Sequence, residues 1–327
     1  MKTRRAYVDL TWNRAAVITK MTGYQENATY TDQASGEADS LDVAIHGEKW
    51  IGPWFPVEGD TLTATIKVYN WEREGDNRSL PCGSFVLDNP TFNGWPVAGT
   101  ISAVSVPADS SFRETKRSKT WENITVEEIG KEIAGRAGVT LVYDVESGPI
   151  QIKTIEQSEQ TDCNFYMDLC NTYGLAMKVY SKKIVVFDRE VYKAKGPVGT
   201  ITRDMVKSFS WSGQLAGTYT GGEYTYTDPN TEEEIKVNVG GGPRILKLSG
   251  KADNKADAER KIKAAVANAN HGAKKLSMTI VGNAMWVASQ CVTVQDMGQL
   301  SGKYYMDKIV HNVGGGYTMD LEMSLVE

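Results

Sequence analysis

The sequence contains few of the residues that usually build metal or cofactor sites. Of its 327 residues only 3 are histidine and 4 are cysteine. The histidines, His46, His271 and His311, lie far apart, and none is spaced with a second histidine or cysteine as a metal site requires. The sequence therefore predicts no metal ion and no cofactor, and we interpret His311 as a hydrogen-bonded structural residue.

The four cysteines are scattered along the chain. Only Cys163 and Cys170 fall on one face of a predicted helix, and this spacing favours core packing over a ligand pair. Since no set of paired cysteines is present, the sequence is typical of a protein kept in a reducing cytoplasm.

Long hydrophobic runs and an excess of basic residues are also missing. No stretch approaches the ~18 apolar residues that a membrane span needs, and the charged first residues are not followed by the apolar run of a signal peptide. The formal net charge is −5, whereas nucleic-acid-binding domains normally carry a basic surplus. We expect neither membrane insertion nor specific nucleic-acid binding.

Catalytic motifs are absent as well. The sequence has no nucleophile elbow, P-loop or dinucleotide fingerprint, and its glycine-rich runs are predicted to form turns. Its paired carboxylates, such as Glu127 and Glu128, lie at a helix start or in a solvated turn, which does not favour general acid–base work. The sequence predicts that the chain is not an enzyme.

A repeat with an offset of 36 residues occupies the middle of the chain. Residues 125–144 and 162–181 each predict one helix, one glycine and one strand, and each copy is followed by a further strand. Ile129 falls on Phe165 when the copies are aligned. The sequence therefore predicts a compact α/β module built from two tandem α-β-β units.

The ends of these two helices carry specific signals. Thr125 and Glu128 predict a capping box at the first helix, and Asp162 is expected to cap the second. Gly138 and Gly174 stand where a left-handed residue would end each helix.

Segments rich in β-strand patterns flank the module. Apolar and polar residues alternate in 6–12, 41–45 and 62–68, and 84–88 and 99–106 complete a set of short strands, while no strand is assigned to the polar interval before Leu41. After the module, strands resume around one helix at 253–270, whose buried stripe is predicted to comprise Ala258, Ile262, Val266 and Ala269.

The predicted fold class is therefore α+β, mainly β, with three domains. Residues 1–112 are expected to form a first β-barrel and residues 113–200 the α/β module. Residues 201–327 are expected to form a second β-barrel with one helix.

The last third of the chain carries several motifs in a fixed order. They are an alanine-rich helix, Gly282, Val292-x-Val294, Ser301-Gly302, Tyr304-Tyr305, His311, the glycine run 314–316 and Tyr317 with an alternating terminal strand. In this order they resemble the phage late-control D family of contractile-tail baseplate hubs, which is related to the hubs of phage-like bacteriocins and type VI secretion spikes. Residues 120–134 are similar to the start of that family's middle module. Ser289-Gln290 departs from the Pro-Gly that many members have.

The resemblance implies a structural hub of a phage tail or phage-tail-like bacteriocin. Family hubs are trimers in which each chain supplies two tail-tube-like β-barrels, so that a pseudo-six-fold ring joins the hexameric tail tube to the trimeric spike. The implied partners are the spike, the tail tube or tube initiator, baseplate wedge proteins and the tape-measure protein. The implied location is the baseplate of a released particle assembled in the bacterial cytoplasm.

One aromatic cluster allows several interpretations. Trp50, Trp54 and Phe55 are candidate subunit-interface residues, a loop packed on its own barrel, or a carbohydrate-stacking platform. The alternatives to the hub are correspondingly a glycan-binding β module and a tail-associated peptidoglycan hydrolase.

Overall fold

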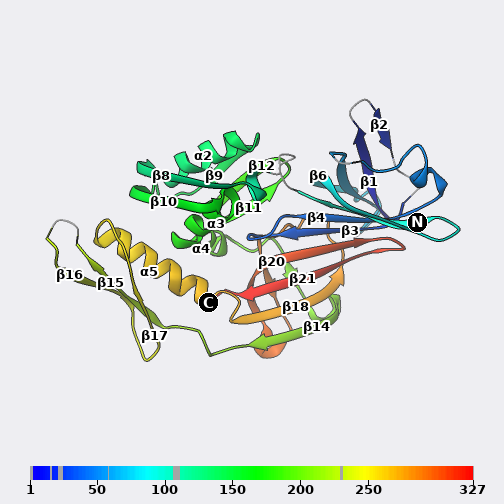
Figure 1. Cartoon of the computed structure of the whole chain (residues 1–327). Coiled ribbons are helices and arrows are strands. Elements are labelled where there is room, and N and C mark those ends of the chain that lie inside the picture. Colours follow the sequence, from blue (N-terminus) through cyan, green and yellow to red (C-terminus); the bar gives the residue numbers. More distant parts are fainter. Residues whose placement is uncertain are drawn as a thin grey trace.

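The computed structural model of the chain describes residues 3–14, 17–20, 25–57, 59–105, 111–228 and 231–326. The fold is mainly β, with 51% strand and 19% helix, which confirms the predicted α+β class. A 13-stranded sheet runs through the molecule, and the α/β module and a small helix-containing layer lie beside it (Figure 1).

The N-terminal half of the sheet is built from seven strands and one 3₁₀ helix. They are β1 (Arg5–Arg14), β2 (Val17–Lys20), β3 (Gln25–Gln33), β4 (Ser40–His46), η1 (Glu48–Ile51), β5 (Thr61–Tyr69), β6 (Arg78–Asn93) and β7 (Ala98–Val104). The predicted alternation in β4 is confirmed, since Leu41, Val43 and Ile45 are buried. Residue 106, at the end of the predicted strand 99–106, lies outside the described residues.

The polar interval before Leu41, to which the sequence assigned no strand, contains β2 and β3. The apolar pattern of β3 is weak because only Ala28 and Tyr30 are apolar on its buried face. The third buried position of that face is Asp32, which is paired with a lysine of the module.

The C-terminal half contributes the remaining strands of the sheet. They are β13 (Thr200–Ile201), β14 (Val206–Gly213), β18 (Lys274–Val281), β19 (Cys291–Val294), β20 (Gly302–Val313) and β21 (Tyr317–Leu325), with 3₁₀ helices η2 (Arg203–Met205) and η3 (Gly298–Leu300). The sheet order is β14-β18-β21-β20-β3-β4-β7-β6-β5-β1-β2, and β19 and β13 lie beside β20. The two halves are thus joined edge to edge by β3 and β20, and one hydrophobic core runs through both.

A five-strand order occurs twice in this sheet. The N-terminal half has β5-β6-β7-β4-β3 and the C-terminal half has β19-β20-β21-β18-β14, with antiparallel neighbours throughout. Register shifts fall at matching places, between Leu87 and Asn89 in β6 and between Met306 and Lys308 in β20. Aligning these shifts makes β3 the counterpart of β14 and β6 the counterpart of β20.

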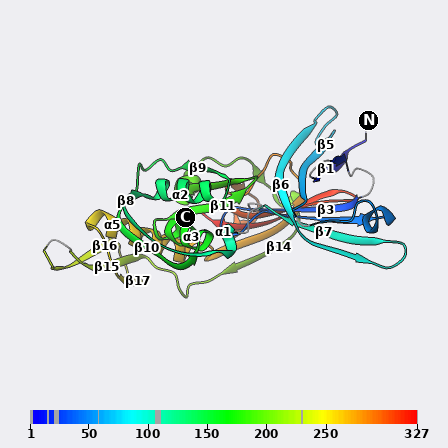
Figure 2. The same ribbon diagram turned by 45° about the horizontal axis from the view of Figure 1, so that its top comes forward.

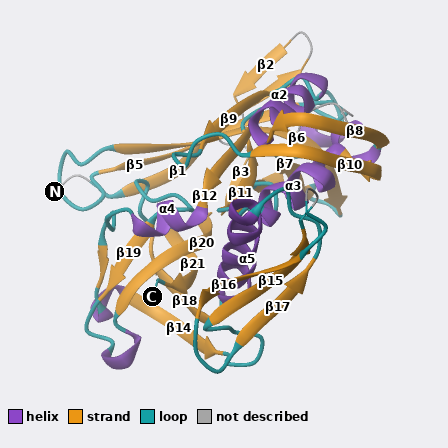
Figure 3. Cartoon of the chain, turned by 90° about the vertical axis from the view of Figure 1, so that its left-hand side faces the viewer, coloured by secondary structure: helices purple, strands orange, loops and turns teal. Residues whose placement is uncertain are grey.

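The two halves differ in one connection. Only residues 34–39 join β3 to β4, whereas the link from β14 to β18 contains three strands and the longest helix. These are β15 (Gly221–Thr227), β16 (Glu234–Gly240), β17 (Ile245–Ser249) and α5 (Lys255–Asn270). They have a small core of their own, to which Tyr226 and Ile262 contribute (Figure 3).

Helix α5 agrees closely with the predicted helix at 253–270. Asn254 caps it by accepting a hydrogen bond from the Asp257 backbone N–H at 3.0 Å. Ala258 and Ile262 of the predicted stripe are buried, and Val266 and Ala269 are half-buried. A second face contacts the module, because Ala264 lies against Gly174.

The α/β module has its own hydrophobic core. Its elements are α1 (Ser111–Glu114), β8 (Lys116–Thr125), α2 (Val126–Arg136), β9 (Thr140–Asp144), β10 (Gln151–Thr161), α3 (Asp162–Thr172), β11 (Leu175–Tyr180), β12 (Lys183–Asp188) and α4 (Arg189–Ala194). The offset of 36 residues holds for α2 and α3 at both ends. The second strands diverge, since β10 pairs with β8 whereas β12 lies between β11 and β9.

The helix ends of the module match the sequence signals except at one position. The capping box of Thr125 and Glu128 is present, and Gly138 and Gly174 have φ of 65° and 76°. Thr161, and not Asp162, caps α3 by accepting a hydrogen bond from the Asn164 N–H.

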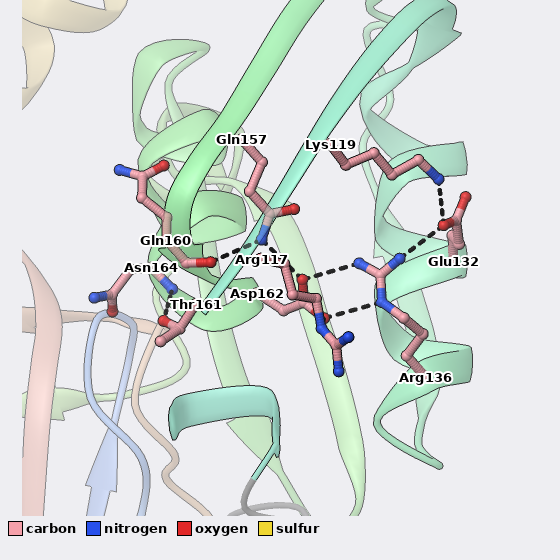
Figure 4. A network of polar contacts seen from close by, with 9 residues as sticks. All are labelled: Arg117, Lys119, Glu132, Arg136, Gln157, Gln160, Thr161, Asp162 and Asn164. Atoms are coloured by element: carbon pink, nitrogen blue, oxygen red, sulfur yellow. Dashed lines mark hydrogen bonds and ion pairs between the residues drawn. The ribbon is translucent and has the colours of Figure 1, made fainter. Parts of the chain in front are cut away.

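The Asp162 carboxylate has a different role, because it holds elements of the module together. It accepts hydrogen bonds from Nε and Nη2 of Arg136 at 3.0 and 2.9 Å, and from the Gln157 amide at 3.0 Å (Figure 4). Arg117 forms a further ion pair at 3.4 Å. A fully buried carboxylate with these partners links α2, α3, β8 and β10.

Candidate functional site

One face of the large sheet is polar across both halves. Residues that face each other on neighbouring strands share a face, and hydrogen bonds join several such pairs. They include Ser102 with Asp42 at 2.5 Å, Thr29 with Asn312 at 3.3 Å, and Thr279 with Asp320 at 2.6 Å. Short polar side chains therefore form a continuous surface that bonds to itself.

Ion pairs with exposed side chains extend this polar face at both ends. Lys67 pairs with Asp9 at 2.6 Å in the N-terminal half, and Lys308 pairs with Glu322 at 3.0 Å in the C-terminal half. Each half thus has an ion pair on this face, whereas Asp42 and Asp320 accept hydrogen bonds from neutral side chains.

The opposite face of the sheet carries a buried ionic cluster. The Lys178 ammonium of β11 forms an ion pair with Asp32 of β3 and another, at 3.1 Å, with Asp39. The Tyr30 hydroxyl donates to Asp39 at 3.0 Å, and the Ala288 N–H donates to Asp32 at 2.8 Å. This cluster attaches the module to the face opposite the polar one.

Burial dominates the electrostatics of this cluster. Desolvation raises the pKa of Asp39 to about 6, although the positive charge of Lys178 opposes the shift. Desolvation lowers the pKa of Lys178, but Asp32 and Asp39 outweigh it and leave that pKa raised. The lysine therefore remains charged while the cluster is intact.

Sequence reasoning did not find this cluster. Lys178 lies 146 residues from Asp32 in the chain, so no local spacing connects the lysine with the aspartates. The available signal was a lysine inside the apolar strand LAMKVY, together with an aspartate on the buried face of β3.

His311 lies in the core where the two halves meet. Its Nδ1 is 2.8 Å from the Tyr317 hydroxyl, and its ring stacks on Tyr30 at 5.5 Å. Burial lowers its pKa to about 4, with Asp32 acting in the opposite direction. These contacts agree with the interpretation of His311 as a structural residue.

A second surface of interest is the free edge of the sheet at β14, at the bottom of the sheet in Figure 1. Every residue of this strand is at least partly exposed. Phe209, Trp211 and the following Leu215 are exposed by 55%, 47% and 75%. A free edge with large apolar side chains is a surface that proteins normally cover.

The aromatic cluster singled out in the sequence is split by the fold. Trp50 is fully buried and stacks on Trp12 at 5.1 Å, and Trp54 packs edge-on against Trp50 at 5.4 Å. Phe55 is 51% exposed, with its ring 5.9 Å from that of Phe92. Trp50 therefore has no surface for a partner, and the interface role remains a prediction for Trp54 and Phe55.

Within the described residues, no group of three or more His, Cys, Asp or Glu side chains is arranged to hold a metal ion. The helices of the same residues include none that is long and apolar enough to cross a membrane.

No family model matches the chain, but two curated proteins are similar to it in sequence. Over 202 residues it is 30% identical to a probable baseplate hub protein of Escherichia phage P2, covering 59% of this chain and 49% of that protein. Over 244 residues it is 25% identical to a probable baseplate hub protein of Escherichia phage 186, covering 72% and 60%. The chain thus matches about half to three-fifths of these relatives' lengths.

Solved structures share the fold over nearly the whole chain. The tail protein from Neisseria meningitidis MC58 matches with a TM-score of 0.73 at 13% identity, covering 97% of this chain and 96% of that one. The E. coli c3393 protein, a type VI secretion component, matches with a TM-score of 0.60 at 11% identity, covering 93% and 74%. The sequence matches confirm the resemblance to baseplate hub proteins, and the solved structures show that the chain shares the fold of phage tail and type VI secretion proteins.

Proposed function

We propose that the chain is the structural hub of a contractile-tail baseplate, assembled as a trimeric ring that joins a six-fold tail tube to a three-fold spike. The observation that carries this proposal is the five-strand order that occurs twice in the chain. Three chains offer six similar β units, so one assembly can match partners of both symmetries.

The polar face is the proposed lining of the channel. Many of the hydrogen-bonding groups on this face are already paired with neighbours, so they present few free groups to a passing polymer. The module, held on the opposite face by Lys178, would then lie outside the ring and contact surrounding baseplate proteins.

The proposed partners follow from this arrangement. The tail tube or its initiator would bind one rim of the ring and the spike protein the other, while wedge proteins would contact the outside and the tape-measure protein the channel. Assembly would take place in the bacterial cytoplasm, before the phage or phage-tail-like particle is released.

The proposed role is a scaffold and not a catalyst. The buried carboxylate Asp162 is engaged by two arginines, and the buried acids Asp32 and Asp39 are engaged by Lys178. Incubating purified cell wall with the protein tests this point. Lysis that a single carboxylate substitution abolishes would contradict it.

A structure of the assembled particle tests the hub itself. We expect three copies of the 36.0 kDa chain between tube and spike, with the polar sheet face toward the axis. One copy or six copies in the baseplate, or a module that fills the lumen, would overturn the proposal.

A further inference from the structure

We propose that β14 of one chain pairs antiparallel with the free edge of β6 (residues 88–93) in a second copy of the chain. The pairing would use the register that β3 and β20 adopt within a single chain. This inference rests on the proposed trimeric ring and adds the strands and residues that would join its copies.

The template for this contact is the join between the two halves. Along β20, residues 308–313 have β21 on one side and β3 on the other. Along β6, the counterpart residues 89–93 have β7 on one side, and β5 on the other side ends its pairing at Val86. Among the described strands, β6 therefore offers the edge that β20 offers, but without a partner strand and, since Pro90 has no N–H, with one hydrogen-bond donor fewer.

β14, the strand that would pair with the β6 edge, also differs in burial from its counterpart β3. In β3 and the residue after its end, Ala28, Tyr30 and Ala34 are each only 3% exposed, because β20 covers them. Their counterparts along β14 are Phe209, Trp211 and Leu215, which are exposed by 55%, 47% and 75%. The chain thus places three large exposed apolar side chains where its own internal join buries two alanines and a tyrosine.

The register between the copies follows from the pairing of β3 with β20 within one chain. Within the chain, Tyr30 lies opposite His311 and their rings stack at 5.5 Å. The counterparts of this pair are Trp211 and Phe92, so Trp211 of one copy would lie opposite Phe92 of the next. Phe55 already contacts Phe92 and would form the side of the same aromatic contact.

This arrangement closes into a ring. Among the described strands, β3 and β20 supply the two edges of the internal join, and their counterparts, β14 and residues 89–93 of β6, have no partner strand on that side. A head-to-tail contact between different surfaces closes when its rotation divides the circle. Three internal joins and three joins between copies would give six similar steps of about 60°.

Disulfide trapping tests the register directly. Within the chain Ala34 donates to the Asp307 carbonyl, so the alternation of the ladder makes Thr31 and Val310 a non-hydrogen-bonded pair, the closer kind. Their counterparts are Ser212 and Thr91. After mild oxidation, the double variant Ser212→Cys/Thr91→Cys should form covalent dimers and trimers on a non-reducing gel. It should form no oligomers larger than a trimer.

An internal disulfide cannot imitate this result. Six strands separate β14 from β6 in the sheet, which is about 30 Å along its surface. The wild-type chain under the same oxidant controls for Cys163, the one native cysteine that is not buried. The double variant Ser210→Cys/Thr91→Cys is out of register by two residues and should crosslink at least tenfold more slowly.

A second variant separates this inference from the hub proposal. Trp211→Asp should shift the native mass of the full-length protein from trimer to monomer, whereas Met285→Asp, at an exposed apolar residue between β18 and β19 and outside both strands, should not. A trimer that survives Trp211→Asp, or that crosslinks equally well out of register, overturns the proposed pairing and leaves the hub intact. A chain that neither crosslinks nor assembles in the particle as three copies overturns both.

Discussion

The two halves of the sheet share a strand order but differ in what covers their outer strand. In the N-terminal half β20 covers β3, and the cluster around Lys178 fixes this strand to the module. In the C-terminal half the counterpart strand β14 is a free edge. Asp32, which anchors β3, has Gly213 as its counterpart in β14, so this half has no equivalent anchor.

The comparison shows that a repeated backbone can hold very different side chains. The inner positions are alike, since Leu41, Val43 and Ile45 correspond to Leu276, Met278 and Ile280, and all six are buried. The outer strand diverges because its surroundings differ. Neighbouring elements, and not the strand order, decide which residues are accepted there.

The largest expected effect comes from breaking the anchor that only the N-terminal half has. Lys178→Met would leave the buried acids Asp32 and Asp39 without their counter-charge, and we expect a loss of about 3–5 kcal/mol in the free energy of unfolding. Urea denaturation measures this loss. Lys67→Met is the matched control, because it removes an ion pair of similar length between partly exposed side chains and should shift the midpoint far less.

The counterpart positions Tyr30 and Trp211 give the most direct comparison. Tyr30→Ala creates a cavity at the join and removes a hydrogen bond to Asp39, so it should destabilise the monomer by about 3 kcal/mol. Trp211→Ala should change the unfolding of the monomer by under about 1 kcal/mol, because its side chain is half exposed. Equal losses in the two variants would show that β14 is already covered within the chain.

His311 and its counterpart Phe92 differ in their response to pH. The pKa of His311 is lowered to about 4 in the folded protein from an ordinary value of 6.5, so the folded state binds fewer protons between these values. Its contribution is complete above pH 6.5 and is lost as the pH falls toward 4, by at most about 3 kcal/mol. His311→Asn should therefore lose less stability than the wild type between pH 7 and pH 4.5.

Asp39 acts in the opposite direction over an overlapping range. Its pKa is raised to about 6, so folding is favoured as this group takes up a proton below that pH. The wild type and His311→Asn both contain Asp39, so the difference between their pH profiles of stability isolates the contribution of His311. If His311→Asn had the same pH profile of stability as the wild type, the lowered pKa assigned to His311 would be contradicted.

The smallest expected effect concerns the connection that only the C-terminal half has. Ala264 of α5 is buried against Gly174, so Ala264→Leu should overpack this contact and cost about 1–3 kcal/mol. Ala265→Leu, at the next and only half-buried position, should change stability by less than about 0.5 kcal/mol. Hydrogen exchange in α3, measured for both variants, would show whether α5 supports the module.

Much of the fold was readable from local pattern. Strict alternation identified β4 and β5, and the caps at Thr125 and Gly138 fixed the ends of α2 to within one or two residues. The offset of 36 residues correctly paired α2 with α3. These signals succeed because each depends on residues close together in the chain.

The remaining features depend on contacts between distant residues. β3 was missed because Asp32 occupies a buried position that only Lys178, 146 residues away, makes acceptable. The role of Trp50 stayed open because nothing local shows that Trp12 covers it. The candidate edges of β14 and β6 became visible only when the two ladders were compared register by register.

The connection from β14 to β18 has a consequence for any ring built from this chain. The counterpart link in the N-terminal half is short, so the unit of β15–β17 and α5 occurs once for every two β units (Figure 2). Around a closed circle it would mark alternate positions of an otherwise even wall. Partners that bind the wall would find six similar sites, and partners that bind the added unit would find three. An insertion at a single turn is enough to halve the rotational symmetry that the outside of the assembly presents.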